Sequence, residues 1–174
     1  MHHEVRDEVR TFVNKYVSAM GNNICIADIG AYDVNGNLRD LFQRSGWVYT
    51  GFDMSSGPNV DIVLPASHDW PDVPSASFDV VVSVSTLEHT PRPWLVVKEM
   101  SRIVKQGGLV CFTAPYAWPF HQHPIDCWRI YPDAMRAIME DADLDVMETK
   151  MVSASRSAGA GTWLGDTVGI GRKR

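Results

Sequence analysis

The fold is decided by the run Phe78-Asp79-Val80-Val81-Val82-Ser83-Val84 and by the residues that follow it. A short β-branched run of this kind predicts a strand buried on both faces, as in parallel sheets. A helix is predicted over residues 93–104, because Pro93 stands at its start and apolar residues recur on one face. Gly107-Gly108 ends that helix, and residues 109–113 predict the next strand.

Similar units extend on both sides of this stretch. Only a short Ser/Gly/Pro turn precedes the strand expected at 60–64, so the crossover helix usually found there is expected to shrink to a loop or single turn. Residues 114–130 form a long aromatic and histidine-rich connection, and residues 153–161 are a flexible loop by composition. The other predicted elements are helices at 3–19 (within an N-terminal segment 1–20), 35–42 and 132–142, and strands at 24–29, 47–52, 144–152 and 162–172.

Length, composition and charge narrow the class of protein. The 174 residues suit a single domain (1–174), and 45% apolar with 21% charged residues is ordinary globular usage. A net charge of −5 argues against nucleic acid as a partner. The longest apolar run, 80–84, is too short to cross a membrane, and the N-terminus lacks the apolar segment of a signal peptide. Three cysteines without metal-ligand spacing suit reduced thiols, so a cytoplasmic location is expected.

The carboxyl ends of the predicted strands carry polar or small residues. Repeated strand–helix units predict a doubly wound, mostly parallel sheet, and such α/β sheets bind ligands beyond the carboxyl ends of their strands. We therefore expect these residues to meet in one crevice: Asp28, Gly30, Asp53, Ser83, Ser85, Thr113 and Ala114.

A family resemblance rests on four segments. Asp28-Ile29-Gly30-Ala31-Tyr32-Asp33-Val34-Asn35-Gly36 follows the first strand, Asp53 ends the second, Leu87-Glu88-His89 follows the strand at 78–84, and Glu99 to Gly108 closes the next helix. Together, over about residues 24–152, these segments resemble the class I S-adenosylmethionine-dependent methyltransferases. The resemblance implies a Rossmann-like sheet of about seven strands flanked by helices, with the last strand antiparallel. It also implies S-adenosyl-L-methionine as the cofactor and a small-molecule acceptor. The cofactor-binding residues that it implies are Asp28, Gly30, Ala31, Tyr32, Asp53, Met54 and Ser83.

Physical arguments support several of these assignments. Gly30 lets the backbone pass close to a ligand. A loop that leads into a helix N-terminus presents free amides, which suit the carboxylate of a methionine moiety. The Asp53 carboxylate can accept both hydrogens of a ribose diol. Asp28 has a second interpretation, since a carboxylate at a strand end often caps nearby amides.

Two departures from the family pattern affect the expected pocket. Tyr32 and Val34 stand where the family's loop usually has further glycines, so the tyrosine either lies over the cofactor or narrows the pocket. Pro65-Ala66 replaces the acidic residue often found near the adenine. The adenine is then expected to contact backbone and apolar groups, with Asp69 or Trp70 as further contacts.

The segment 114–130 is expected to roof the crevice on the acceptor side. His89 and His121 are the candidate general bases, because an imidazole pKa of about 6.5 suits removal of a hydroxyl proton. The candidate substrate-side residues are His123, Asp126, Trp128 and Arg129. Two other interpretations stay open. The substrate-side residues order the loop by local hydrogen bonds, or His121, His123 and Asp126 converge on a divalent metal, although we assign no metal ligand.

The favoured hypothesis is O-methylation of a small polar or glycan-type acceptor. The alternative is a catalytically degenerate module on the same fold that binds cofactor or a protein partner. An NAD-linked dehydrogenase is disfavoured, because residues 30–35 do not supply the expected G-x-G-x-x-G. A nucleic-acid methyltransferase is disfavoured by the acidic charge, and the oligomeric state is left open.

Overall fold

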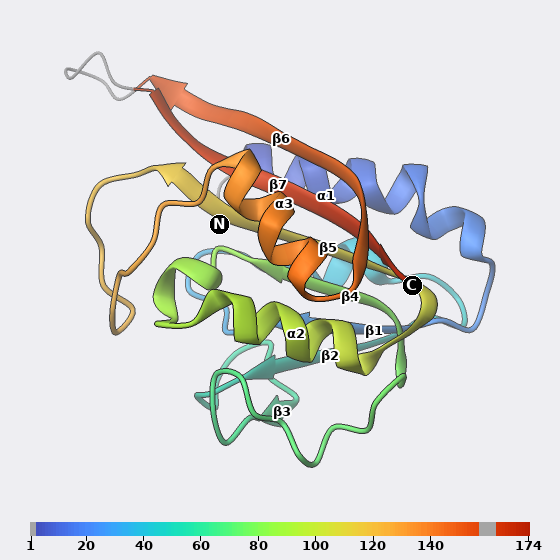
Figure 1. The fold of residues 1–174 in the computed structure, drawn as a ribbon. Helices are drawn as coiled ribbons and strands as arrows, with labels where there is room; N and C mark the ends of the chain where they lie inside the picture. Colours follow the sequence, from blue (N-terminus) through green and yellow to red (C-terminus); the bar gives the residue numbers. More distant parts are fainter. Residues whose placement is uncertain (1–2, 157–162) are drawn as a thin grey trace.

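The described strands form one mixed sheet in the order β3-β2-β1-β4-β5-β7-β6 (Figure 1). The computed structural model describes residues 3–156 and 163–174. The strands are β1 (Cys25–Ile29), β2 (Val48–Asp53), β3 (Ile62–Val63), β4 (Phe78–Val84), β5 (Val104–Ala117), β6 (Leu144–Arg156) and β7 (Trp163–Lys173). The helices are α1 (His3–Lys15), α2 (Pro93–Ile103) and α3 (Pro132–Asp141), with 3-10 turns η1 (Val17–Met20), η2 (Arg39–Phe42) and η3 (Leu87–His89).

The strand directions match the expected doubly wound sheet. β1 pairs in parallel with both β2 and β4, β3 with β2, and β5 with β4. β7 lies between β5 and β6 and is antiparallel to both. The prediction of a mostly parallel sheet with an antiparallel last strand is therefore confirmed.

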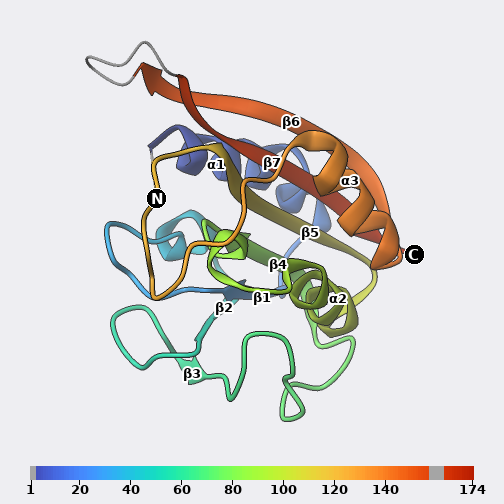
Figure 2. The same ribbon diagram turned by 60° about the vertical axis from the view of Figure 1, so that its left-hand side comes forward.

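Helices cover both faces of the sheet, with α1 on one face and α2 and α3 on the other (Figure 2). Side chains alternate between the two faces along a strand, so both sets of positions in a doubly covered strand must be apolar. Ile26 and Val80 belong to the cluster that packs with α1, whereas Ala27 and Val81 belong to the cluster that packs with α2 and α3. This double burial is why the central strands are almost continuous apolar runs. Among the described helices, none combines the length and apolar character needed to span a bilayer.

Several element boundaries differ from the predictions. The helix predicted at 35–42 is reduced to the single turn η2, because Gly36 has φ +116° and its N–H donates to the Asp33 carboxylate. The predicted helix at 3–19 is divided into α1 and η1. β3 is only two residues long, and no helix lies between β2 and β3, as expected. Residues 153–156 continue β6 rather than forming a loop, and residues 157–161 of that predicted loop lie outside the described residues.

Candidate active site

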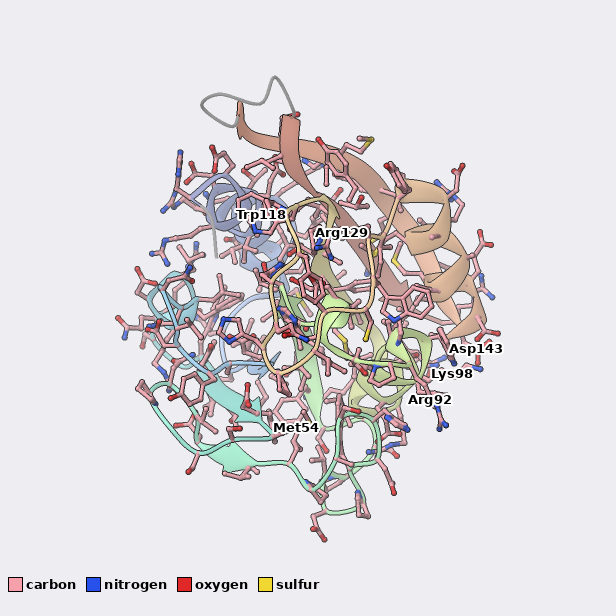
Figure 3. The ribbon with its side chains drawn as sticks, turned by 90° about the vertical axis from the view of Figure 1, so that its left-hand side faces the viewer. Met54, Arg92, Lys98, Trp118, Arg129 and Asp143 are labelled. Atoms are coloured by element: carbon pink, nitrogen blue, oxygen red, sulfur yellow. The ribbon has the colours of Figure 1, made fainter. Side chains whose placement is uncertain are left out.

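A cavity of about 880 Å³ opens at the carboxyl ends of the parallel strands. Figure 3 views this end of the molecule, with Met54 after β2 and with Trp118 and Arg129 on the segment between β5 and α3. We call residues 118–131 the roof segment. The cavity is lined from β1, β2, η3 and β7 as well as from the roof segment. A crevice is therefore present at the strand ends, and its volume falls in the usual range for small-molecule sites. Four of the seven residues expected there line it, whereas the other three are fully buried and do not: Ser83, Thr113 and Ala114.

Gly30 allows a close approach between two loops of the cavity wall. Its φ is +80°, and a Cβ built on it would lie 2.1 Å from Thr86 Oγ1. No other residue fits there without displacing the Thr86 side chain. The backbone N–H groups of Gly30 and Ala31 both donate to the Phe52 carbonyl, at 2.8 and 2.9 Å.

The expected row of free amides after β1 is not formed. The N–H of Tyr32 donates to Asp53 Oδ2 at 3.2 Å, and the N–H of Asp33 donates to the Pro58 carbonyl at 3.1 Å. With Gly30 and Ala31 also bonded, four successive amides are already used within the protein. The loop also leads into only a short 3-10 turn, so a helix N-terminus contributes nothing here.

Asp53 stands at the end of β2 and lines the cavity. One carboxylate oxygen accepts the Tyr32 N–H and the other accepts the Ser55 N–H at 2.9 Å. Each carboxylate oxygen has a second lone pair. The two backbone donors therefore fix the orientation of the carboxylate while leaving it able to accept two further hydrogen bonds. Met54, the next residue, is half exposed and also lines the cavity.

Asp28 lines the cavity but is almost completely buried. Its carboxyl accepts a hydrogen bond from the Tyr49 hydroxyl. Burial raises the pKa of Asp28 to about 7, and the Tyr49 hydrogen bond opposes this shift. At neutral pH this group is therefore only partly ionised, unlike an ordinary aspartate.

The raised pKa of Asp28 predicts a pH dependence of stability. The folded state keeps this proton at pH values where the unfolded chain releases it, so stability is lost as pH rises through about 7. Between about pH 6 and pH 8, wild type should lose about 1 kcal/mol more unfolding free energy than Asp28→Asn. Urea denaturation at the two pH values measures this difference, and equal losses in both proteins would contradict it.

Tyr32 lies at the rim of the cavity and does not close it. The tyrosine is 40% exposed, and a Cβ built on Gly57 would lie 2.2 Å from its Cε2 atom, so the ring packs on that glycine. Val34 is also exposed and lines the same cavity. The bulky residues of this loop thus border the pocket and leave its volume open.

Three sequence assignments on the cofactor side are corrected. Ser83 is fully buried, its hydroxyl donates to the Ile29 carbonyl at 2.8 Å, and it does not line the cavity. Trp70 is a core residue whose Nε1 donates to the Ala66 carbonyl, and neither Trp70 nor Asp69 lines this cavity. Leu64, Ser67 and Ser85 line it instead. Ser85 has φ +50°, which turns the chain out of β4 at the cavity wall.

The roof segment is held by an ion pair within it and by hydrogen bonds to residues of the cavity wall. Arg129 binds both oxygens of Asp126, at 2.6 and 2.8 Å, and Asp126 also accepts the His121 N–H at 2.7 Å. The Arg129 guanidinium holds the pKa of Asp126 well below its usual range. Trp128 donates from Nε1 to the Thr90 carbonyl and packs edge-on against Trp94.

This arrangement favours the loop-ordering interpretation for three of the four candidate substrate residues. Asp126, Trp128 and Arg129 do not line the cavity, whereas His123 does. The metal trio of His121, His123 and Asp126 is not assembled either, because Arg129 occupies the Asp126 carboxylate.

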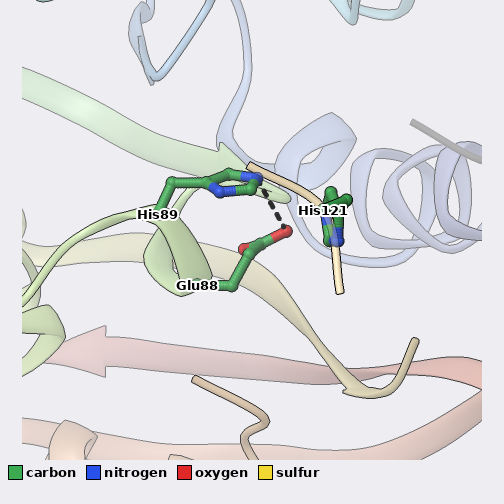
Figure 4. A group of neighbouring side chains, drawn as sticks. All are labelled: Glu88, His89 and His121. Carbon is green, nitrogen blue, oxygen red and sulfur yellow. Dashed lines mark ion pairs between the residues drawn. The ribbon is translucent and has the colours of Figure 1, made fainter. Parts of the chain in front are cut away.

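The two candidate bases, His89 and His121, lie close together in the cavity wall, next to Glu88 (Figure 4). The two imidazole rings are edge-to-face with centroids 4.9 Å apart. Glu88 Oε1 lies 3.7 Å from His89 Nε2. Burial lowers the pKa of His89 and raises that of Glu88 to about 8. His89 is therefore neutral at neutral pH, and Glu88 holds a proton for most of the time.

Asp166 on β7 is a second buried carboxyl group in the cavity wall. It is 2% exposed, and burial raises its pKa to about 6. Its Oδ2 and Glu88 Oε2 are buried and accept no hydrogen bond from any described residue. Sequence reasoning missed both carboxyls, although a lone aspartate in a predicted strand and a glutamate in Leu87-Glu88-His89 were available signals.

Known proteins resemble this chain in sequence and in fold. Residues 27–112 match the family model described as a methyltransferase domain. A ubiquinone biosynthesis O-methyltransferase from Thiobacillus denitrificans is 41% identical over 101 residues, which are 51% of this chain and 43% of that protein. The chain thus spans less than half the length of this relative.

Two solved structures show the same fold at low sequence identity. The cyclase SpnF has a TM-score of 0.73 at 14% identity, over 96% of this chain and 80% of that one. The 1,6-didemethyltoxoflavin-N1-methyltransferase of Burkholderia thailandensis, solved with bound 1,6-didemethyltoxoflavin and S-adenosylhomocysteine, has a TM-score of 0.67 at 16% identity, over 99% of this chain and 90% of that one. The sequence match over residues 27–112, the strand order and this likeness of fold support the resemblance of the chain to the class I S-adenosylmethionine-dependent methyltransferases.

Proposed function

We propose that this chain transfers a methyl group from S-adenosylmethionine to an oxygen atom of a small polar acceptor. The observation that carries the proposal is a single cavity lined by two groups of residues. We call the part lined by Asp53 and Gly30 the cofactor end, and the part lined by the polar cluster of Glu88, His89 and His121 the acceptor end. The name of the Thiobacillus denitrificans relative, an O-methyltransferase, supports an oxygen acceptor.

The cofactor end of the cavity fits an adenosyl group. Asp53 is oriented by two backbone amides and would accept the two ribose hydroxyls. Gly30, whose missing Cβ prevents a clash with Thr86, would let the backbone follow the cofactor closely. When bound, S-adenosylmethionine supplies an activated methyl group. The residues of the chain would then align the acceptor, exclude water and remove the proton of the acceptor hydroxyl.

The acceptor end offers groups that can take a proton. His89 donates from Nδ1 to the Ile125 carbonyl at 2.6 Å, so its Nε2 carries a lone pair toward the cavity. We assign His89 and His121 to activation of the acceptor hydroxyl and His123 to acceptor contact. The raised pKa values of Glu88 and Asp166 make these carboxyls further proton carriers near neutral pH.

The experiment is a calorimetric titration with S-adenosylhomocysteine, followed by transfer of labelled methyl groups to panels of phenols, polyols and amines. We expect saturable binding and label in hydroxyl-bearing acceptors. Label in amines alone would overturn the choice of oxygen. Binding without transfer to any panel would favour the alternative of a cofactor-binding module, which Val34 and Tyr32 in the cofactor loop support.

A further inference from the structure

Three side chains at the acceptor end of the cavity have the donor set of a metal site. Glu88, His89 and His121 each offer one ligand atom, and these atoms all lie within 4.8 Å of one another. The separation of Glu88 Oε1 from His89 Nε2 is 3.7 Å. Two ligands of a tetrahedral zinc ion are about 3.3 Å apart, given zinc–ligand distances of about 2.0–2.1 Å. Small rotamer adjustments would therefore bring the three atoms onto one cation.

Hydrogen bonds fix the tautomers of both imidazoles in the form that a metal requires. His89 Nδ1 lies 2.6 Å from the Ile125 carbonyl, and His121 Nδ1 lies 3.0 Å from the Pro119 carbonyl. A carbonyl oxygen only accepts, so in both rings Nδ1 carries the hydrogen and Nε2 the lone pair. Metal-binding histidines typically donate their second ring N–H to a carbonyl or carboxylate in this way.

Glu88 supplies an independent indication of a missing partner. Its side chain is 1% exposed, and its Oε2 accepts no hydrogen bond from any described residue. Buried polar atoms without a partner are rare, because the lost hydration is not replaced. Among the described residues no Lys or Arg forms an ion pair with this carboxyl, whereas Asp126 is paired with Arg129. A cation between Glu88 and the two histidines would supply what the carboxyl lacks.

We propose that Glu88, His89 and His121 bind a divalent transition-metal cation, for which Zn²⁺ has the best-matched donor set. Two imidazoles and one carboxylate leave a fourth position open to the cavity, as in catalytic zinc sites. An acceptor hydroxyl bound at that position would lose its proton more readily. This role rests on the proposed methyl transfer, whereas the binding of the cation does not. In this arrangement the two Nε2 atoms act on the acceptor through the metal rather than directly.

The experiment titrates chelator-treated full-length protein with Zn²⁺ by calorimetry and with Co²⁺ by visible absorption, in excess Mg²⁺. We expect one tight Zn²⁺ per chain and Co²⁺ bands of a low-coordinate site. Glu88→Gln and His121→Ala should each weaken Zn²⁺ binding by about tenfold or more. His123→Ala is the matched control, because His123 lies on the same segment, 5.9 Å from the His89 ring, but outside the trio.

Each outcome decides the proposal. Unchanged Zn²⁺ affinity in Glu88→Gln and His121→Ala would overturn it, and so would an equal loss in His123→Ala. Thermal melts identify a variant that has failed to fold, and the other variant then decides. S-adenosylhomocysteine binding is measured separately on the same samples. A protein that binds Zn²⁺ but no cofactor would overturn the proposed function and leave the metal site standing.

Discussion

Replacing Asp53 with alanine is expected to weaken S-adenosylhomocysteine binding by about 10- to 1,000-fold. The carboxylate is oriented at the end of β2 by the amides of Tyr32 and Ser55, and it lines the cavity. Charge-assisted hydrogen bonds contribute about 1.5–3 kcal/mol each, and the loss of one such bond to a ribose diol, or of two at about 2 kcal/mol each, spans this range. Calorimetric titration of the two proteins at one ionic strength measures the change.

Two further variants separate recognition from loop structure. Asp53→Asn keeps one acceptor for the Tyr32 or Ser55 amide and removes the charge. Its affinity for S-adenosylhomocysteine should therefore lie between those of wild type and Asp53→Ala. Asp69→Ala removes a carboxylate that does not line the cavity, and its affinity should equal that of wild type. Equal affinity of Asp53→Ala and wild type would remove Asp53 from the cofactor site. Weakened binding by Asp69→Ala would reinstate the adenine contact that we have corrected.

The central sheet was predictable because its pattern is local. Val80, Val81 and Val82 are all fully buried. Both faces of β4 are covered, so successive residues along the strand are apolar, and this pattern can be seen in the strand's own sequence. The same applies to α2, where Pro93 begins the helix and one face is buried. By contrast, the length of β5 is set by pairing with β7, a strand far along the chain. Strand ends fixed by such long-range pairing leave no local signal.

The helix predicted at 35–42 was wrong for a reason that the sequence contained. Asp33 and Gly36 are residues that favour a turn, and the carboxylate of Asp33 does accept the Gly36 amide and the Asn37 side chain. The same turn removed the helix N-terminus on which the idea of free amides depended. That prediction gave no weight to the turn-forming residues, and the structure shows a turn in their place.

The residues that follow the strand ends could be predicted to lie at the site from their positions in the sequence. The residues that lie next to them in the folded chain could not. Asp53 and Gly30 follow strand ends and were placed correctly at the cavity. Glu88 and Asp166 lie 78 positions apart in the numbering and line one cavity only because β7 inserts next to β5. The buried carboxyls of the acceptor end therefore became visible only once the strand order was known.

An ion pair with a buried carboxylate orders the roof segment, and Arg129→Ala is expected to destabilise the protein by about 3 kcal/mol. The Asp126 side chain is 1% exposed and would keep only His121 as a described partner, through the backbone N–H and through Nδ1 at 3.3 Å. Arg129 also donates to the carbonyls of Trp118 and Pro119, at 3.0 and 3.1 Å, and these two hydrogen bonds would be lost. Urea denaturation at neutral pH measures the loss.

The double variant Arg129→Ala with Asp126→Ala tests the cause of that loss. Removing both partners leaves no unpaired buried charge, so the double variant should be more stable than Arg129→Ala alone. Arg136→Ala is the matched control, because the one hydrogen bond of this arginine to a described residue is a long one to Thr149 at the surface. The stability of this variant should lie within about 0.5 kcal/mol of wild type. A double variant as unstable as the single one would show that the carbonyl contacts of Arg129, and not its pairing with Asp126, hold the roof segment over the cavity.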